Sequence, residues 1–132
     1  MSQANRVLVV ALFSYLLIIL DISVVLTGLP DIREAFDLSA IGLSWVQNAY
    51  LLCFGGFLLL AARAGDHFGR KRVFLIGLGI FTASSLAIGL ASSAALLIGA
   101  RAVQGVGAAA AALSAMGLVV CVFALRPAIA RR

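Results

Sequence analysis

Four long apolar runs, separated by short polar or charged segments, most constrain what this chain can fold into. A helix that spans a bilayer needs about 20 mostly apolar residues, and the runs 7–29, 43–62, 73–91 and 96–122 meet this length. Apolar residues make up 64% of the 132 residues and charged residues 11%, whereas soluble proteins are roughly 45–50% apolar. Membrane β-strands would alternate over short segments. The sequence therefore predicts an all-α membrane protein with four transmembrane helices.

The N-terminal run begins like a signal peptide but has the length of a span. Arg6 followed by residues 7–20 resembles the basic and apolar regions of a secretory signal. The apolar run, however, continues past Asp21 to Leu29, and no small-residue cleavage site follows. We therefore expect a first transmembrane helix, which Pro30 brings to an end because proline lacks an N–H.

The charges between the runs predict the orientation, because Lys and Arg accumulate in cytoplasmic loops. Segment 30–41 is acidic overall, segment 63–72 is strongly basic, and segment 92–95 carries no charge. Three arginines follow the fourth run: Arg126, Arg131 and Arg132. We expect a multi-pass protein of the cell (inner or plasma) membrane, with both termini and segment 63–72 in the cytoplasm.

The start of the second run has its own signals. Ser39 can cap the helix through its side-chain oxygen. Trp45 and Tyr50 are expected at the outer interface, where amphipathic rings settle.

Asp21 lies inside the first run. A central Asp costs about 2.5–3.5 kcal/mol on insertion scales, so such residues usually face a cavity, a partner or a proton path. The alternative is an aspartic acid that only bonds a neighbouring helix. The face of the first predicted helix that carries Asp21 is expected to point into the bundle. The residues of that face are Ser14, Leu17, Ile18, Asp21, Val25 and Gly28.

A second polar group lies in the fourth run. Arg101 and Gln104 are three residues apart and share a helix face with Gly105 and Ala108. Small residues let helices approach closely in lipid. The alternative is that Arg101 extends to the outer headgroups from a position near the helix start.

The basic segment contains the sequence GDHFGRKR at 65–72. Gly65 and Gly69 are expected to allow a tight turn between two helices. Asp66 can meet a helix N-terminus or an arginine. The basic residues that follow can engage acidic groups or lipid phosphates, or serve only as a cytoplasmic anchor.

Other function classes find little support. There is no nucleophile–base pair or phosphate-binding glycine loop, so we expect no enzyme activity, no cofactor and no metal. Cys53 and Cys121 lie apart in predicted spans and are expected to be buried, inert thiols. The net charge of +5 lies at helix ends rather than on a polar domain, so we expect no nucleic-acid partner.

Four motifs follow one another along the chain: LDISVVLTGLP at 20–30, SWVQNAYLL at 44–52, GDHFGRKR at 65–72 and ARAVQGVGAA at 100–109. In order and spacing they resemble the N-terminal part of the major facilitator superfamily, and specifically its drug:proton antiporter branch with fourteen helices. Two departures concern polar groups. Leu26 stands where the first motif has Asn, and His67 stands where the third has Arg.

The resemblance implies that residues 1–132 correspond to helices 1–4 of a secondary active transporter for proton-coupled efflux (antiport) of small amphipathic compounds or drugs. It places Asp21, Arg101 and Gln104 in the proton-coupling or substrate cavity. A gating loop would contain Gly65, Asp66, Gly69, Arg70, Lys71 and Arg72. The implied partners are the lipid bilayer, the remaining transporter helices and, in the full-length protein, protons and a small-molecule substrate. Such transporters are built from two helical halves, so we expect a truncated N-terminal fragment that is not transport-competent alone.

Two alternatives remain. Four helices with one carboxylate in the first also suit a small multidrug exporter that acts as an antiparallel dimer, although the charged loops do not favour dual topology. A nontransporting membrane subunit would use its small-residue faces to bind another protein.

Overall fold

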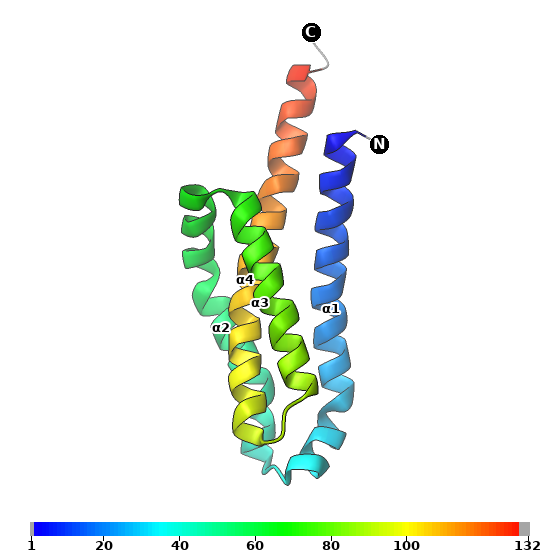
Figure 1. Cartoon of the computed structure of the whole chain (residues 1–132), viewed down its shortest axis with the longest axis vertical. Coiled ribbons are helices and arrows are strands. Elements are labelled where there is room, and N and C mark those ends of the chain that lie inside the picture. The colour runs from blue at the N-terminus through cyan, green and yellow to red at the C-terminus, as the bar shows by residue number, and fades with distance from the viewer. Residues whose placement is uncertain (1, 130–132) are drawn as a thin grey trace.

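In the computed structural model, which describes residues 2–129, four α-helices form an antiparallel bundle (Figure 1). Their bounds are α1 Gln3–Phe36, α2 Ala40–Phe68, α3 Arg70–Gly89 and α4 Ala94–Ile129. Each of these four helices contains a stretch long and apolar enough to cross a membrane. The predicted all-α membrane fold is therefore confirmed. The helices extend beyond the expected spans, except that α3 ends at Gly89 rather than at residue 91.

The helix ends gather at two poles. The beginning of α1, the α2–α3 junction at Gly69 and the last turns of α4 lie at the upper pole in Figure 1. The α1–α2 and α3–α4 connections lie at the lower pole. The basic and acidic segments thus occupy opposite poles, and which pole faces the cytoplasm stays a prediction. Of the C-terminal arginines used in that prediction, Arg131, Arg132 and the side chain of Arg126 lie outside the described residues.

The expectation that Pro30 ends the first helix is wrong, because α1 continues through it to Phe36. Proline has a helical φ and removes one backbone donor, and membrane helices tolerate this loss where neighbouring groups compensate for it. The helix ends nearly two turns after Pro30, at Phe36, and the following residue Asp37 takes a left-handed conformation with φ 48°. Its connection to α2 is short, and the predicted cap is confirmed because Ser39 Oγ accepts the backbone N–H of Gly42 at 3.1 Å.

α4 is the central helix, since it packs extensively against α2 and α3 and also contacts α1. A Cβ added at Gly107 would lie 2.7 Å from the backbone nitrogen of Phe81 on α3. Such close contact requires small residues, which provide the packing surface of helices in lipid. Among the described side chains of α4, the buried alanines are Ala100, Ala108, Ala109, Ala111 and Ala115.

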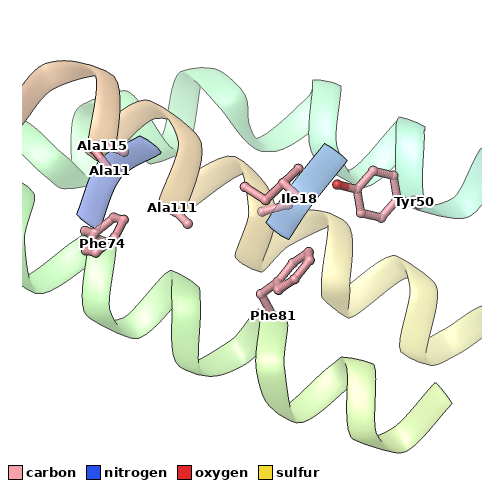
Figure 2. Close-up of a cluster of buried hydrophobic side chains, with 8 residues drawn as sticks. Ala11, Ile18, Tyr50, Phe74, Phe81, Ala111 and Ala115 are labelled. Atoms are coloured by element: carbon pink, nitrogen blue, oxygen red, sulfur yellow. The ribbon is translucent and has the colours of Figure 1, made fainter. Parts of the chain in front are cut away.

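An apolar cluster joins all four helices (Figure 2). Phe74 and Phe81 extend from α3 toward α4, while Tyr50 comes from α2 and Ile18 from α1. The core therefore follows α4 along much of the bundle.

The inward face of α1 is narrower than expected. Ser14, Ile18 and Val25 are buried, as predicted, and Asp21 and Gly28 are partly buried. Leu17 is 51% exposed, so its placement on this face is wrong. Successive helical residues are about 100° apart, and Leu17 lies just beside the buried stripe.

Candidate functional site

The guanidinium of Arg101 lies at the centre of the candidate site. Arg101 is the largest of the fully buried side chains, with 0% of its surface exposed. The alternative that it extends to the lipid headgroups is therefore wrong. A buried guanidinium carries five N–H donors, and leaving them without acceptors in an apolar interior would be costly.

Three helices supply acceptors for this guanidinium. Arg101 Nη1 donates to Asp21 Oδ2 on α1 at 2.9 Å and to Gln104 Oε1 on α4 at 2.5 Å. From α2, the Val46 carbonyl oxygen accepts from Nε at 3.3 Å and Gln47 Oε1 accepts from Nη2 at 3.2 Å. Arg101 thus bonds side chains and backbone that are far apart in the sequence.

The three residues predicted for the cavity form a closed ring of hydrogen bonds. Besides its bond to Arg101, Gln104 donates from Nε2 to Asp21 Oδ1 at 3.0 Å. Both carboxylate oxygens of Asp21 therefore have donors, and both polar ends of Gln104 have partners. The sequence placed these residues together correctly, and their role in transport stays a prediction.

Tyr50 completes the site from α2. Its ring centroid lies 4.4 Å from Arg101 Cζ, which is a cation–π contact. The expectation of an interfacial Tyr50 is wrong, because only 1% of this residue is exposed. Trp45 from the same run is 48% exposed. Tyr50 points inward because α2 turns the face of Val46 and Tyr50, which are four residues apart, toward α4.

The electrostatics of the site rest on one ion pair. The positive charge of Arg101 is matched by the carboxylate of Asp21, and charge-assisted bonds of this kind are short and strong. Removing one partner would leave the other charge buried and unpaired. The two partners differ in access, since 15% of the Asp21 side chain is exposed and none of the Arg101 side chain is. Of the two partners, Asp21 is therefore the one that other groups can contact without a change in the packing of the bundle.

Sequence reasoning missed the contributions of Val46, Gln47 and Tyr50. The acceptor of Val46 is a backbone carbonyl, for which the sequence carries no signal. Gln47 is one of the few polar residues in a largely apolar run. Gln47 and Tyr50 are three residues apart and so lie on one side of a helix. This spacing could have predicted a polar face on α2.

The basic segment lies at the upper pole of Figure 1 and is not part of the Arg101 site. Only Gly69 separates α2 from α3, with φ 94° and ψ 132°. Gly65 lies inside α2, so its expected place in the turn is wrong. Because the turn needs one residue with positive φ, α2 can continue to Phe68. The basic residues Arg70, Lys71 and Arg72 form the first turn of α3.

Asp66 and Arg70 form an ion pair across this turn. Arg70 Nη2 lies 3.3 Å from Asp66 Oδ1, and their side chains are 40% and 64% exposed, respectively. Exposed pairs of this type contribute about 0–1 kcal/mol. Beside them, between α2 and α4, is an open cavity of about 240 Å³, with Ser114 in its wall.

The cysteines are not both buried as expected. Cys53 is partly buried, whereas Cys121 is exposed on the outer surface of α4. The bundle leaves this part of α4 uncovered, which the sequence pattern alone does not reveal.

Four membrane-length helices, three of which surround a buried Arg–Asp pair, define a polytopic membrane protein with an internal polar site. Residues 11–126 match the family model of the Major Facilitator Superfamily, and the chain belongs to this superfamily of membrane transporters. This membership does not favour the alternative of a separate family of small dimeric exporters.

Several curated relatives are similar over most of this chain. The cephamycin export protein of Amycolatopsis lactamdurans is 44% identical over 126 residues, which are 96% of this chain and 26% of that protein. The lincomycin resistance protein of Streptomyces lincolnensis is 44% identical over 80% of this chain and 22% of its own length. A multidrug resistance protein of Mycobacterium tuberculosis is 43% identical over 81% of this chain and 20% of its own length. The chain thus spans about a quarter or less of the length of these relatives.

Proposed function

We propose that this chain supplies helices 1–4 of a proton-coupled exporter (antiporter) of small amphipathic compounds or drugs. The observation that carries the proposal is the buried Arg101–Asp21 pair, in which only the acid is partly open. Protonation of Asp21 would remove the charge that balances Arg101 and weaken the link between α1 and α4. The names of the relatives, which include export and resistance proteins, support a small-molecule substrate.

The Asp66–Arg70 pair and its flanking residues serve as the gating contact in this proposal. They lie at a helix junction, away from the Arg101 site, and their side chains remain open to a partner. The remaining transporter helices and the lipid bilayer would cover the exposed apolar residues of α1 and α2. Both termini and this junction would face the cytoplasm of the cell.

An efflux assay tests the proposal. The whole encoded protein, expressed from its complete reading frame, should lower the cellular content of a fluorescent amphipathic cation, and an uncoupler should abolish this effect. Asp21→Asn should abolish efflux that is coupled to protons. Asp31→Asn is the matched control, because it removes the same charge from an exposed position in the last part of α1.

Efflux that is indifferent to the uncoupler would contradict proton coupling. Efflux that persists in Asp21→Asn with the same dependence on the proton gradient would contradict the role of the ion pair. If the whole protein moves no compound and copurifies with another membrane protein, the alternative of a nontransporting subunit would replace this proposal.

A further inference from the structure

The hydroxyl group of Tyr50 has no role in the hydrogen bonds described above. It is buried and has no hydrogen-bond partner among the described residues. The ring has two clear functions, since it lies 4.4 Å from Arg101 Cζ and stacks on Phe54 with 6.0 Å between centroids. Phenylalanine could perform both of them. A buried hydroxyl without a partner is unfavourable, so its presence calls for a partner in another state of the site.

The direction of the hydroxyl identifies this partner. In Figure 2 it points from α2 toward α1 beside Ile18. Asp21 follows Ile18 by three residues on the inward face of α1, and side chains on a helix lean toward its N-terminus. Tyr50 and Asp21 also contact the same guanidinium, by the ring and by a 2.9 Å hydrogen bond, respectively. Because both residues contact one guanidinium, the acid is the candidate partner of the hydroxyl.

We propose that Tyr50 is a positioning residue that donates a hydrogen bond to Asp21 once this acid is protonated. Asp21 takes a proton from water on its exposed side and becomes neutral. Its bond to Arg101 Nη1 then loses its ionic character, and the carboxyl carbonyl turns to accept the O–H of Tyr50. No covalent bond is formed or broken apart from the O–H bond made by the incoming proton.

Arg101 remains held while Asp21 changes partners. Gln104, Gln47 and the Val46 carbonyl still accept its N–H groups, and the Tyr50 ring still lies against its cationic face. The ionisable groups near Asp21 are Arg101 on α4 and Tyr50 on α2. α1 has only the exposed Tyr15 besides Asp21 between residues 7 and 30, and α3 has no ionisable side chain between Val73 and Gly89.

An incoming substrate is a weaker candidate for the partner. The oxygen atom of the Tyr50 hydroxyl is closed to solvent in this structure, so a new molecule would have to open the packing between helices to reach it. Asp21 is already within the bundle. The proposal thus assigns Tyr50 to the protonated state of the acid rather than to the bound compound.

Infrared difference spectroscopy on the whole encoded protein in lipid tests this proposal. Acidification should produce the C=O stretching band of the protonated Asp21, which is assigned by its loss in Asp21→Asn. A carbonyl that accepts a hydrogen bond absorbs at lower frequency, so Tyr50→Phe should shift this band to higher frequency. The matched control Tyr15→Phe removes the same hydroxyl from a side chain that is 56% exposed, and it should leave the band unchanged.

An Asp21 band at the same frequency in wild type and Tyr50→Phe would overturn the proposal, as would the absence of any Asp21 band on acidification. If Tyr50→Phe does not fold, the tyrosine C–O stretching band of the wild-type protein gives a second test. That band should shift on acidification, and Asp21→Asn should remove the shift. A persistent shift in Asp21→Asn would again refute the assignment.

The proposal rests on the proposed function only through proton uptake by Asp21. The spectroscopic measurement requires no transported compound and no gradient. A protein that shows the shifted band but no efflux would contradict the transport proposal and leave the role of Tyr50 supported.

Discussion

Replacing Gly105 with alanine tests the packing on which the buried site depends. A Cβ at this position would overlap the backbone carbonyl oxygen of Tyr50 and lie 3.1 Å from the backbone nitrogen of Phe54. Both atoms belong to the backbone of α2, so no side-chain rotation can relieve the overlap. α2 and α4 would have to move apart.

Opposing contributions set the expected size of the effect. Alanine favours a helix over glycine by about 1 kcal/mol, whereas overpacking costs about 1–3 kcal/mol. Separation of the helices also affects the bonds from Arg101 to Val46 and Gln47, which at 3.3 and 3.2 Å are already long. A hydrogen bond to a charged group contributes about 1.5–3 kcal/mol. With one such bond lost, we expect Gly105→Ala to lower the free energy of unfolding by about 2–4 kcal/mol.

Reversible unfolding of the whole encoded protein in mixed micelles measures this change. Gly99→Ala in the same helix is the matched control, because a Cβ there would meet nothing within 4 Å. The control should be unchanged or more stable by up to about 1 kcal/mol, owing to the higher helix propensity of alanine. Equal stability of Gly105→Ala and Gly99→Ala would refute the close approach of α2 and α4.

Three further substitutions address the site and the basic junction. Arg101→Lys keeps the charge but cannot donate to all the acceptors at once. Reversible unfolding in mixed micelles should therefore show that the free energy of unfolding falls by about 2–4 kcal/mol, and wild-type stability would contradict the geometry. Gly69→Ala places a side chain at φ 94°, so thermal unfolding should show that the protein is destabilised by about 1–3 kcal/mol. The control Gly79→Ala, where an added Cβ would meet nothing within 4 Å, should show no such loss. Asp66→Asn should alter stability by less than about 1 kcal/mol because its ion pair is exposed. Efflux should nevertheless fall, and unchanged efflux would contradict its gating role.

The four helices could be predicted because the bilayer leaves few choices. Every backbone polar group in the hydrocarbon region needs a partner within the chain, so long apolar runs become helices. The helix ends depend on weaker local signals. Pro30 and Gly65 were assigned to ends, yet both lie inside helices, since one missing donor or one flexible residue does not outweigh continued helical bonding.

The site could be predicted only where a charged or polar side chain interrupts an apolar run. Asp21, Arg101 and Gln104 were found in this way, and the structure brings them together. Their neighbours on α2 could not be found, because a backbone carbonyl has no sequence signal and because the position of Tyr50 near a helix start suggested the membrane interface. Such contacts between distant segments depend on how the helices pack.

The close packing of α2 against α4 and the burial of the Arg101 charge depend on each other. Gly105 directly follows Gln104 on α4 and lets the backbone of α2 come close. That approach brings the Val46 carbonyl within 3.3 Å of Arg101 and the Tyr50 ring within 4.4 Å of it. A larger residue at 105 would leave the guanidinium with fewer acceptors in an apolar interior, where unpaired donors are costly. The sequence RAVQG at 101–105 therefore acts as a unit, in which arginine supplies the charge, glutamine links it to Asp21, and glycine sets the distance to α2.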